Sequence, residues 1–577
     1  EKYYLDAIEI YERLVKKNAD AYEPDLAMSY NNTGIFYAVH GQPQKAEKYH
    51  LAAIEIRERL VEKNAAAYGP YLADSYNNAG IFYDNQGKRD KAEKYYLAAI
   101  EIQKRLVEKN ADAYEPALAA SYNNAGNFYS DQGQSDKAEK YYLAAIEIRE
   151  RLVEKNAEAY EPDLATSYNN AGIFYKDQGQ PDKAEGYYLA AIGIYERLVK
   201  KNADAYEPAL ATSYNNAGLF YAKQNQPEKA EKYYLAAIEI RERLAEKNAD
   251  AYEPDLATSY NSAGVFYKDQ GQPDKAEKYI LAAIEIRERL VEKNVDAYEP
   301  YLATSYNNAG NFYSDQGQPE KAEKYYLDAI EIYERLVKKN AAAYEPDLAT
   351  SYNNAGVFYD DQNQPDKAEK YYLAAIAIRE RLVEKNADAY EPALADSYNN
   401  AGVFYSGQGQ SEKAEKYYLA AIGIYERLAK KNADAYEPDL AGCYNNAGVF
   451  YYEQGRLEKS EKYILAAIGI YERLVEKNAD AYEPDLAMSY NNAGEFYANQ
   501  DYLEKSEKYY LAAIEIYERL VKENAAAYEP DLADSYFNYY LLKKDKTYLD
   551  KAYEIAKRRQ DDPRCGKLVK DIESMLK

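Results

Sequence analysis

The chain has 577 residues and a formal net charge of −25, because 98 aspartates and glutamates outnumber 73 lysines and arginines. So acidic a chain is a poor general binder of nucleic acid, since contacts to phosphates need a basic surface. No stretch approaches the roughly 18 consecutive apolar residues that a transmembrane helix needs, so no membrane span is expected.

A unit of 46 residues repeats along the sequence. The glycine of an Asn-Asn-Ala-Gly run recurs at this interval from Gly34 to Gly494. The composition agrees, because 70 tyrosines without a single tryptophan are typical of a short unit copied many times. No linker separates the copies, so one array is expected rather than several domains. We assign residues 1–540 to about twelve units, starting within a second helix, and residues 541–577 to C-terminal capping helices.

Residues 117–162 illustrate the two helices predicted in each copy. The first begins near Ala117, because Pro116 suits a helix start, where its missing N–H would lack a partner anyway. Apolar side chains from Leu118 onward recur at spacings of three and four residues and share one face. The helix ends where Gly133 can adopt the left-handed conformation.

The second helix is predicted to begin near Ser135, a place where six other copies carry a proline. It runs to about Asn156, and a polar turn then leads to Pro162 and the next copy. Neither helix shows the period-two alternation of a strand, so the fold class is all-α. Because each helix is apolar on one side only, the copies must stack to bury that side.

Residues 121–146, SYNNAGNFYSDQGQSDKAEKYYLAAI, resemble the tetratricopeptide repeat. The doubled asparagine and the long second helix are similar to the repeats of kinesin light chain. The usual unit has about 34 residues, so the longer second helix expected here should change the superhelical pitch. The resemblance implies an α-solenoid, a right-handed superhelix of stacked antiparallel helix pairs whose first helices line the concave side. It also implies peptide or protein binding without catalysis. The matching residues are Tyr122, Ala125, Gly126, Tyr129, Gly133, Ala138, Tyr142, Ala145 and Ile146.

No group of residues indicates chemistry. An enzyme needs a unique set of side chains at one place, whereas nearly every polar residue here recurs in each copy. His40 and His50 replace a glutamine and a tyrosine of other copies and are interpreted as drift, since a zinc site needs further converging ligands. Cys443 and Cys565 form no disulfide framework, which suits a reducing compartment and leaves export open. We predict no catalytic residue, no cofactor and no metal.

Comparison of the copies separates a variable surface from a constant one. The variable positions form rows on the first helix, for example Ile35, Asn127 and Leu219, on the surface that lines the groove in similar repeats. Between the rows runs a constant asparagine ladder, which we predict to be a peptide-binding groove because an amide can pair with any peptide backbone. The alternative is that the ladder bridges adjacent first helices and holds the stack together. The ladder consists of Asn31, Asn77, Asn123, Asn169, Asn215, Asn261, Asn307, Asn353, Asn399, Asn445 and Asn491.

A second alternating position lies on the second helix, where Tyr11, Arg57, Arg149 and Tyr195 succeed one another in different copies. It predicts either a second binding surface or packing against the next copy, with the arginine stem lying along apolar surface.

Two functions are compatible with this pattern. The first is a non-enzymatic scaffold that binds a peptide or protein segment in the concave groove. Its ligand is expected to be neutral or basic, because the variable rows hold few lysines or arginines and the chain is acidic. The second is a structural protein that self-associates through its solenoid ends into a filament or spacer, which near-identical copies and open ends favour. Residues 541–577, with 11 basic and 7 acidic residues, are interpreted as a polar cap.

Overall fold

Each 46-residue copy folds into two antiparallel helices of equal length. In the copy of α8 (Ala157–Asp177) and α9 (Pro181–Lys201), both helices have 21 residues, three residues form the turn between them, and Asn202 alone forms the corner to the next copy. The computed structural model describes residues 1–560 and 562–576, and these contain 26 helices and no strand. The predicted α-solenoid is therefore confirmed. Asp561 and Lys577 of the predicted cap lie outside the described residues.

The first helices of the copies are α2 (Ala19–Val39), α4 (Ala65–Asn85), α6 (Ala111–Asp131), α8, α10 (Ala203–Lys223), α12 (Ala249–Asp269), α14 (Val295–Asp315), α16 (Ala341–Asp361), α18 (Ala387–Gly407), α20 (Ala433–Glu453), α22 (Ala479–Ala498) and α24 (Ala525–Lys543). The second helices are α1 (Lys2–Val15), α3 (Pro43–Lys63), α5 (Arg89–Val107), α7 (Ser135–Lys155), α9, α11 (Pro227–Lys247), α13 (Pro273–Lys293), α15 (Pro319–Lys339), α17 (Pro365–Lys385), α19 (Ser411–Lys431), α21 (Leu457–Lys477) and α23 (Leu503–Glu523). Two shorter helices follow, α25 (Lys546–Arg558) and α26 (Pro563–Leu576).

The predicted start of the first helix was wrong by six residues. α6 begins at Ala111 rather than Ala117, and Pro116 lies inside it. The cause is Asn110, whose side-chain Oδ1 accepts a hydrogen bond from the N–H of Ala113 at 3.2 Å and so caps the helix. The predicted polar turn is therefore the first turn and a half of this helix. The extra length of the repeat lengthens both helices and not only the second.

Small residues and tyrosine rings fill the core. A Cβ on Gly172 would lie 2.9 Å from the ring of Tyr188 in the second helix of the same copy, so this glycine lets the ring lie directly against the backbone. Tyr175 is also buried, and its hydroxyl donates to Glu139 of the preceding copy at 2.8 Å. Tyrosine thus provides apolar bulk inside the stack and a hydrogen bond at its rim.

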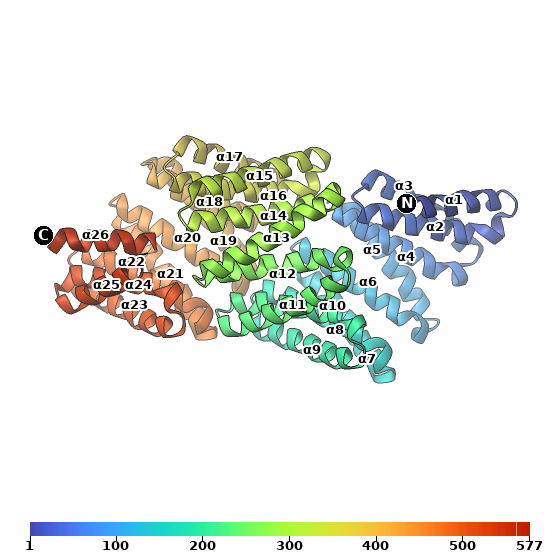
Figure 1. Cartoon of the computed structure of the whole chain (residues 1–577), viewed down its shortest axis with the longest axis horizontal. Coiled ribbons are helices and arrows are strands. Elements are labelled where there is room, and N and C mark those ends of the chain that lie inside the picture. The colour runs from blue at the N-terminus through green and yellow to red at the C-terminus, as the bar shows by residue number, and fades with distance from the viewer. Residues whose placement is uncertain (561, 577) are drawn as a thin grey trace.

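The stack curves with its first helices on the inside. First helices of neighbouring copies contact one another, as α12 contacts α14 and α14 contacts α16. Elements on the inner radius of a curved stack approach each other more closely than those on the outer radius. Figure 1 shows the result, in which the chain winds around the long axis from the N-terminus at one end to the C-terminus at the other.

Successive turns of this superhelix touch along a seam. The glutamine that follows each of the five first helices from α4 to α12 accepts a hydrogen bond from the corner asparagine lying 254 residues further on, so one superhelical turn takes roughly five and a half copies. We call these contacts the inter-turn seam. Its hydrogen bonds run from Asn340 to Gln86 (3.1 Å), Asn386 to Gln132 (2.9 Å), Asn432 to Gln178 (3.0 Å), Asn478 to Gln224 (2.5 Å) and Asn524 to Gln270 (2.7 Å).

Glycines in the turns permit this close approach. Gly133 has φ +69°, which confirms the predicted left-handed helix end, and a Cβ there would lie 2.5 Å from the carbonyl oxygen of Asp388 in the next superhelical turn. Gly455 has the same conformation, with φ +68°, but has nothing within 4 Å of its Cβ position. Glycine is therefore required at the seam for two reasons, the left-handed backbone conformation and the close approach of the next superhelical turn. Beyond the seam, only the left-handed conformation requires it.

Candidate functional site

The variable rows of the first helices lie half-exposed on the inner side of the curve. One of them is largely apolar. Five of its members are exposed between 39% and 45%, although they stand on helices that are otherwise well packed. Asn127 and Asn311 interrupt the row, and each accepts a hydrogen bond from a tyrosine hydroxyl of its own copy. We call the exposed members the concave apolar row: Ile35, Ile81, Leu219, Val357 and Val403.

Carboxylates flank this row. Desolvation by the surrounding protein, together with the nearby charge of Asp131, raises the pKa of Asp84 to about 6. Desolvation, aided by Asp396, likewise raises the pKa of Asp439 to about 6. Lysines interrupt the acidic face at a few places, as where Lys268 bridges Asp269 and Asp315 at 3.0 and 3.1 Å. The concave face is thus apolar along its middle and mainly acidic beside it.

The asparagine ladder lies beneath this surface and joins adjacent copies. Asn215 is 8% exposed, and its Oδ1 accepts a hydrogen bond from Ser259 of the next copy at 3.2 Å. Asn261 accepts one from Ser305 in the same way, also at 3.2 Å. Further ladder bonds of this kind involve Asn31, Asn123, Asn307, Asn353, Asn445 and Asn491 with the corresponding serines.

The alternating position on the second helix sets the direction of these bonds. Where it is arginine, as at Arg241, the guanidinium donates to the Oγ of Ser259 at 2.5 Å, and the serine donates onward to the ladder. Where it is Tyr333, the direction reverses, and Asn307 donates to the Oγ of Ser351 at 2.7 Å. Arg241 is 5% exposed and Tyr333 is 2% exposed, so the packing interpretation of this position is confirmed.

These bonds favour the stacking alternative for the ladder, whereas its direct contact with a ligand stays a prediction. Sequence reasoning missed the serine partner. The signal was present, because a serine stands two residues before the first asparagine in almost every copy, as Ser121 stands before Asn123. A small hydroxyl residue kept at one helical position among apolar neighbours indicates a buried hydrogen bond.

The described residues hold no three His, Cys, Asp or Glu side chains arranged to bind a metal ion. No helix within residues 1–560 and 562–576 is long and apolar enough to span a bilayer.

The copies match family models described as the tetratricopeptide repeat. One model matches overlapping segments that together span residues 71–427, and a second matches residues 26–64, 440–478 and 486–524. The chain belongs to the tetratricopeptide repeat family. Proteins of this family are generally non-catalytic scaffolds for other proteins. No curated protein matches the chain.

Solved structures with similar folds share little sequence with this tetratricopeptide repeat chain. BtubC (BKLC) from P. vanneervenii is 23% identical over 43% of this chain and 92% of its own, with a TM-score of 0.35. The apo form of RapI is 19% identical over 54% of this chain and 99% of its own, with a TM-score of 0.38. Yeast Tom70 is 13% identical over 96% of both chains, with a TM-score of 0.40.

Proposed function

We propose that this tetratricopeptide repeat protein is a non-enzymatic scaffold that binds a protein segment along its concave face. The observation that carries the proposal is the concave apolar row, which no other part of the described chain covers. Exposed apolar side chains that follow one face of a molecule mark an interaction site. An extended segment lying on this face would bury several of them at once.

The acidic border of the row favours a neutral or basic partner. An acidic segment would face Asp84, Asp131 and Asp439, and like charges across an interface disfavour binding. A segment with apolar residues for the row and lysines or arginines for its border complements this face better. Under this proposal the asparagine ladder supports the groove from below and keeps the first helices in register.

Removal of the concave apolar row is expected to weaken partner binding at least about tenfold, because each buried aliphatic side chain contributes roughly 1.5–3 kcal/mol. The variant Leu219→Ser, Val357→Ser, Val403→Ser tests this, with a partner captured from native lysate and titrated by calorimetry. A matched control replaces Leu235, Leu373 and Leu419 on the second helices, which are exposed to 40%, 41% and 42%. Equal loss of binding in both variants would refute binding on the concave face.

Binding of a basic partner should weaken as the pH falls from 7.5 to 5. Asp84 and Asp439, each with a pKa of about 6, gain protons in this interval, so the concave face loses negative charge. Stability should change in the opposite direction. A carboxyl whose pKa is higher in the folded chain than its ordinary 3.8 favours folding as the pH falls from about 6 towards 3.8. Titrations and thermal melts across this range separate the two effects, and affinity that stays constant would argue against acidic recognition.

A second candidate function is self-assembly into a filament or spacer. The observation that favours it is the inter-turn seam, which shows that turns of this repeat pair through their edges. The short turns between helices at Gly317, Gly409 and Gly455 have the same residue types as those at the seam. No neighbouring atom of the described residues lies within 4 Å of the Cβ position of these glycines, so these turns are free to pair. We further propose that α25 and α26 cap the array. Electron microscopy separates the candidates, since the scaffold predicts discrete particles and the second candidate predicts filaments.

A further inference from the structure

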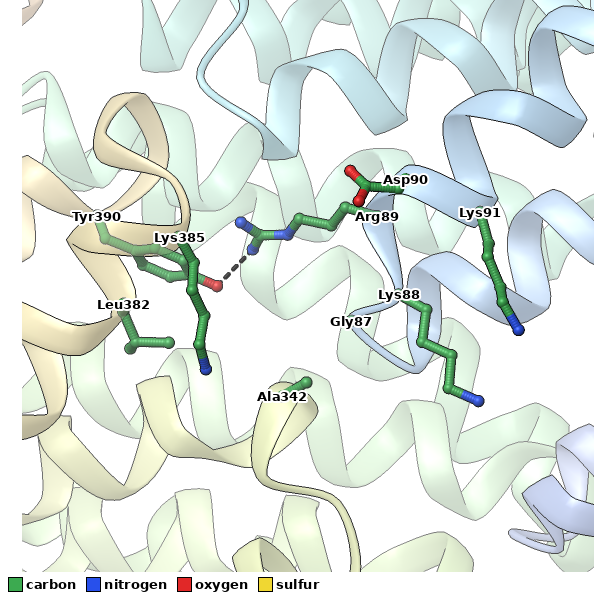
Figure 2. A pocket seen from close by; sticks show the side chains of 9 residues that line it. All are labelled: Gly87, Lys88, Arg89, Asp90, Lys91, Ala342, Leu382, Lys385 and Tyr390. Carbon is green, nitrogen blue, oxygen red and sulfur yellow. Dashed lines mark hydrogen bonds between the residues drawn. The ribbon is translucent and has the colours of Figure 1, made fainter.

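One pocket on the inter-turn seam differs in charge from the others. It lies where the turn between α4 and α5 meets the starts of α16 and α18, and its volume is about 320 Å³, which lies within the range of small-molecule sites. Figure 2 shows Arg89 reaching from one superhelical turn towards Tyr390 of the other, with Lys385 beside Tyr390. Asp90 is the one carboxylate among the nine lining residues.

The corresponding seam pockets are neutralised by a built-in carboxylate. At three equivalent places along the seam, an aspartate in the first turn of a first helix pairs with the lysine at the end of the second helix of the same copy. These pairs are Lys339 with Asp296 (2.7 Å), Lys431 with Asp388 (3.0 Å) and Lys477 with Asp434 (2.7 Å). In the pocket described above, Ala342 replaces the aspartate. Lys385 is left with Glu345, whose carboxylate oxygen is 3.7 Å away.

The opposite side of the same pocket gains a positive charge. Arg89 stands where most copies carry proline, at the first residue of α5. Its guanidinium donates to the hydroxyl of Tyr390 across the seam and lies 4.8 Å from the centre of that ring. No carboxylate of the described residues forms an ion pair with it, although its charge opposes the rise in the pKa of the nearby Asp84 and Asp131. Lys88 and Lys91 point away from the space in Figure 2, and both pair with Glu47 at 3.2 Å.

We propose that this pocket binds a phosphate-class anion between the two superhelical turns. The oxygens of such an ion would accept hydrogen bonds from Arg89 on one turn and from Lys385 and the Tyr390 hydroxyl on the other. Charge-assisted bonds from a guanidinium are the strong ones, and its planar fork fits an oxyanion with two parallel bonds. The ion takes the place that an aspartate side chain fills at the other corners. The bound ion therefore links the two superhelical turns at the one place on the seam where the lysine has no aspartate partner.

Inorganic pyrophosphate titrated into the whole chain by calorimetry tests the proposal, with inorganic phosphate and acetate as comparison ions. Saturable binding of pyrophosphate at one site is expected, with weaker phosphate binding and no acetate binding. The variants Ala342→Asp and Arg89→Pro each restore the residue found at equivalent positions, so both should fold. Each is expected to reduce pyrophosphate affinity at least about tenfold, because each removes or neutralises a charged hydrogen-bond donor of the pocket.

Lys431→Gln serves as the control, because it alters the equivalent seam lysine that already has an aspartate partner. It should leave pyrophosphate affinity unchanged. The absence of saturable binding to the unaltered chain would overturn the proposal. So would binding that persists in Ala342→Asp and Arg89→Pro while their thermal melts show intact folding, because the ion would then bind elsewhere.

Discussion

Replacing three seam glycines with alanine is expected to lengthen the molecule. In the variant Gly87→Ala, Gly133→Ala, Gly179→Ala, each new Cβ would collide with the next superhelical turn. At Gly133 it would lie 2.5 Å from the carbonyl oxygen of Asp388, and at Gly87 it would lie 2.9 Å from the carbonyl oxygen of Ala342. Backbone atoms cannot rotate away as a flexible side chain can, so the turns must separate. Their separation breaks the glutamine–asparagine bonds of the seam.

The matched control is Gly317→Ala, Gly409→Ala, Gly455→Ala. These glycines have φ of +63°, +67° and +68°, against +65°, +69° and +67° for the seam glycines. Both variants therefore carry the same backbone strain, about 1–2 kcal/mol per alanine in the left-handed conformation. The control positions have nothing within 4 Å of the Cβ. Small-angle X-ray scattering should show a larger maximum dimension for the seam variant alone. Equal dimensions for both variants would mean that the seam does not hold the turns together in solution.

Replacing three ladder asparagines with alanine is expected to destabilise the array by several kcal/mol. In Asn215→Ala, Asn261→Ala, Asn307→Ala, three bonds between neighbouring copies disappear. Ser259 and Ser305 lose the acceptor of their hydroxyl hydrogen and keep only the arginine that donates to them, and Ser351 loses its amide donor. Leaving a buried polar group unpaired costs about 1–3 kcal/mol at each site. The loss falls on the interfaces between copies, which supply much of the stability of a repeat array. Thermal and urea denaturation measure it.

The second asparagine of three copies offers the control for the ladder. Asn124, Asn170 and Asn216 are half-buried and form none of the observed hydrogen bonds between copies. Their replacement by alanine should change the free energy of unfolding by only about 0.5 kcal/mol each. If the ladder variant melts like this control yet loses its partner, the ladder is a ligand contact and not a support of the stack.

Sequence reasoning was most accurate where a residue acts through its own backbone. Gly133 ends α6 in the left-handed conformation as predicted, and α9 begins at Pro181, one of the prolines expected at that place. It was wrong at Asn110, where a cap moved the helix start by six residues. An asparagine suits a turn as well as a cap, so only the path of the following chain distinguishes the two.

The position of the candidate surface was predictable from the sequence, whereas the contacts of its side chains were predictable only in part. The variable rows lie half-exposed on the concave face, where the family resemblance placed them. The sequence left two roles open for the ladder, peptide binding or bridging of adjacent first helices, and only the structure shows its burial and its bonds to the next copy. One position on a helix faces both the groove and the adjacent helix, and the distance between neighbouring copies decides which of the two its side chain meets.

The amino-acid sequence by itself determined the two-helix unit, its 46-residue period and the need to stack, because helix periodicity, turn glycines and one-sided apolar faces are local properties. Only the tertiary structure decided that successive turns touch. The rotation between neighbouring copies accumulates over more than five of them, so contact between turns depends on the packing of many side chains together. That accumulated angle brings Arg89 beside Tyr390, two residues that are 301 positions apart in the chain.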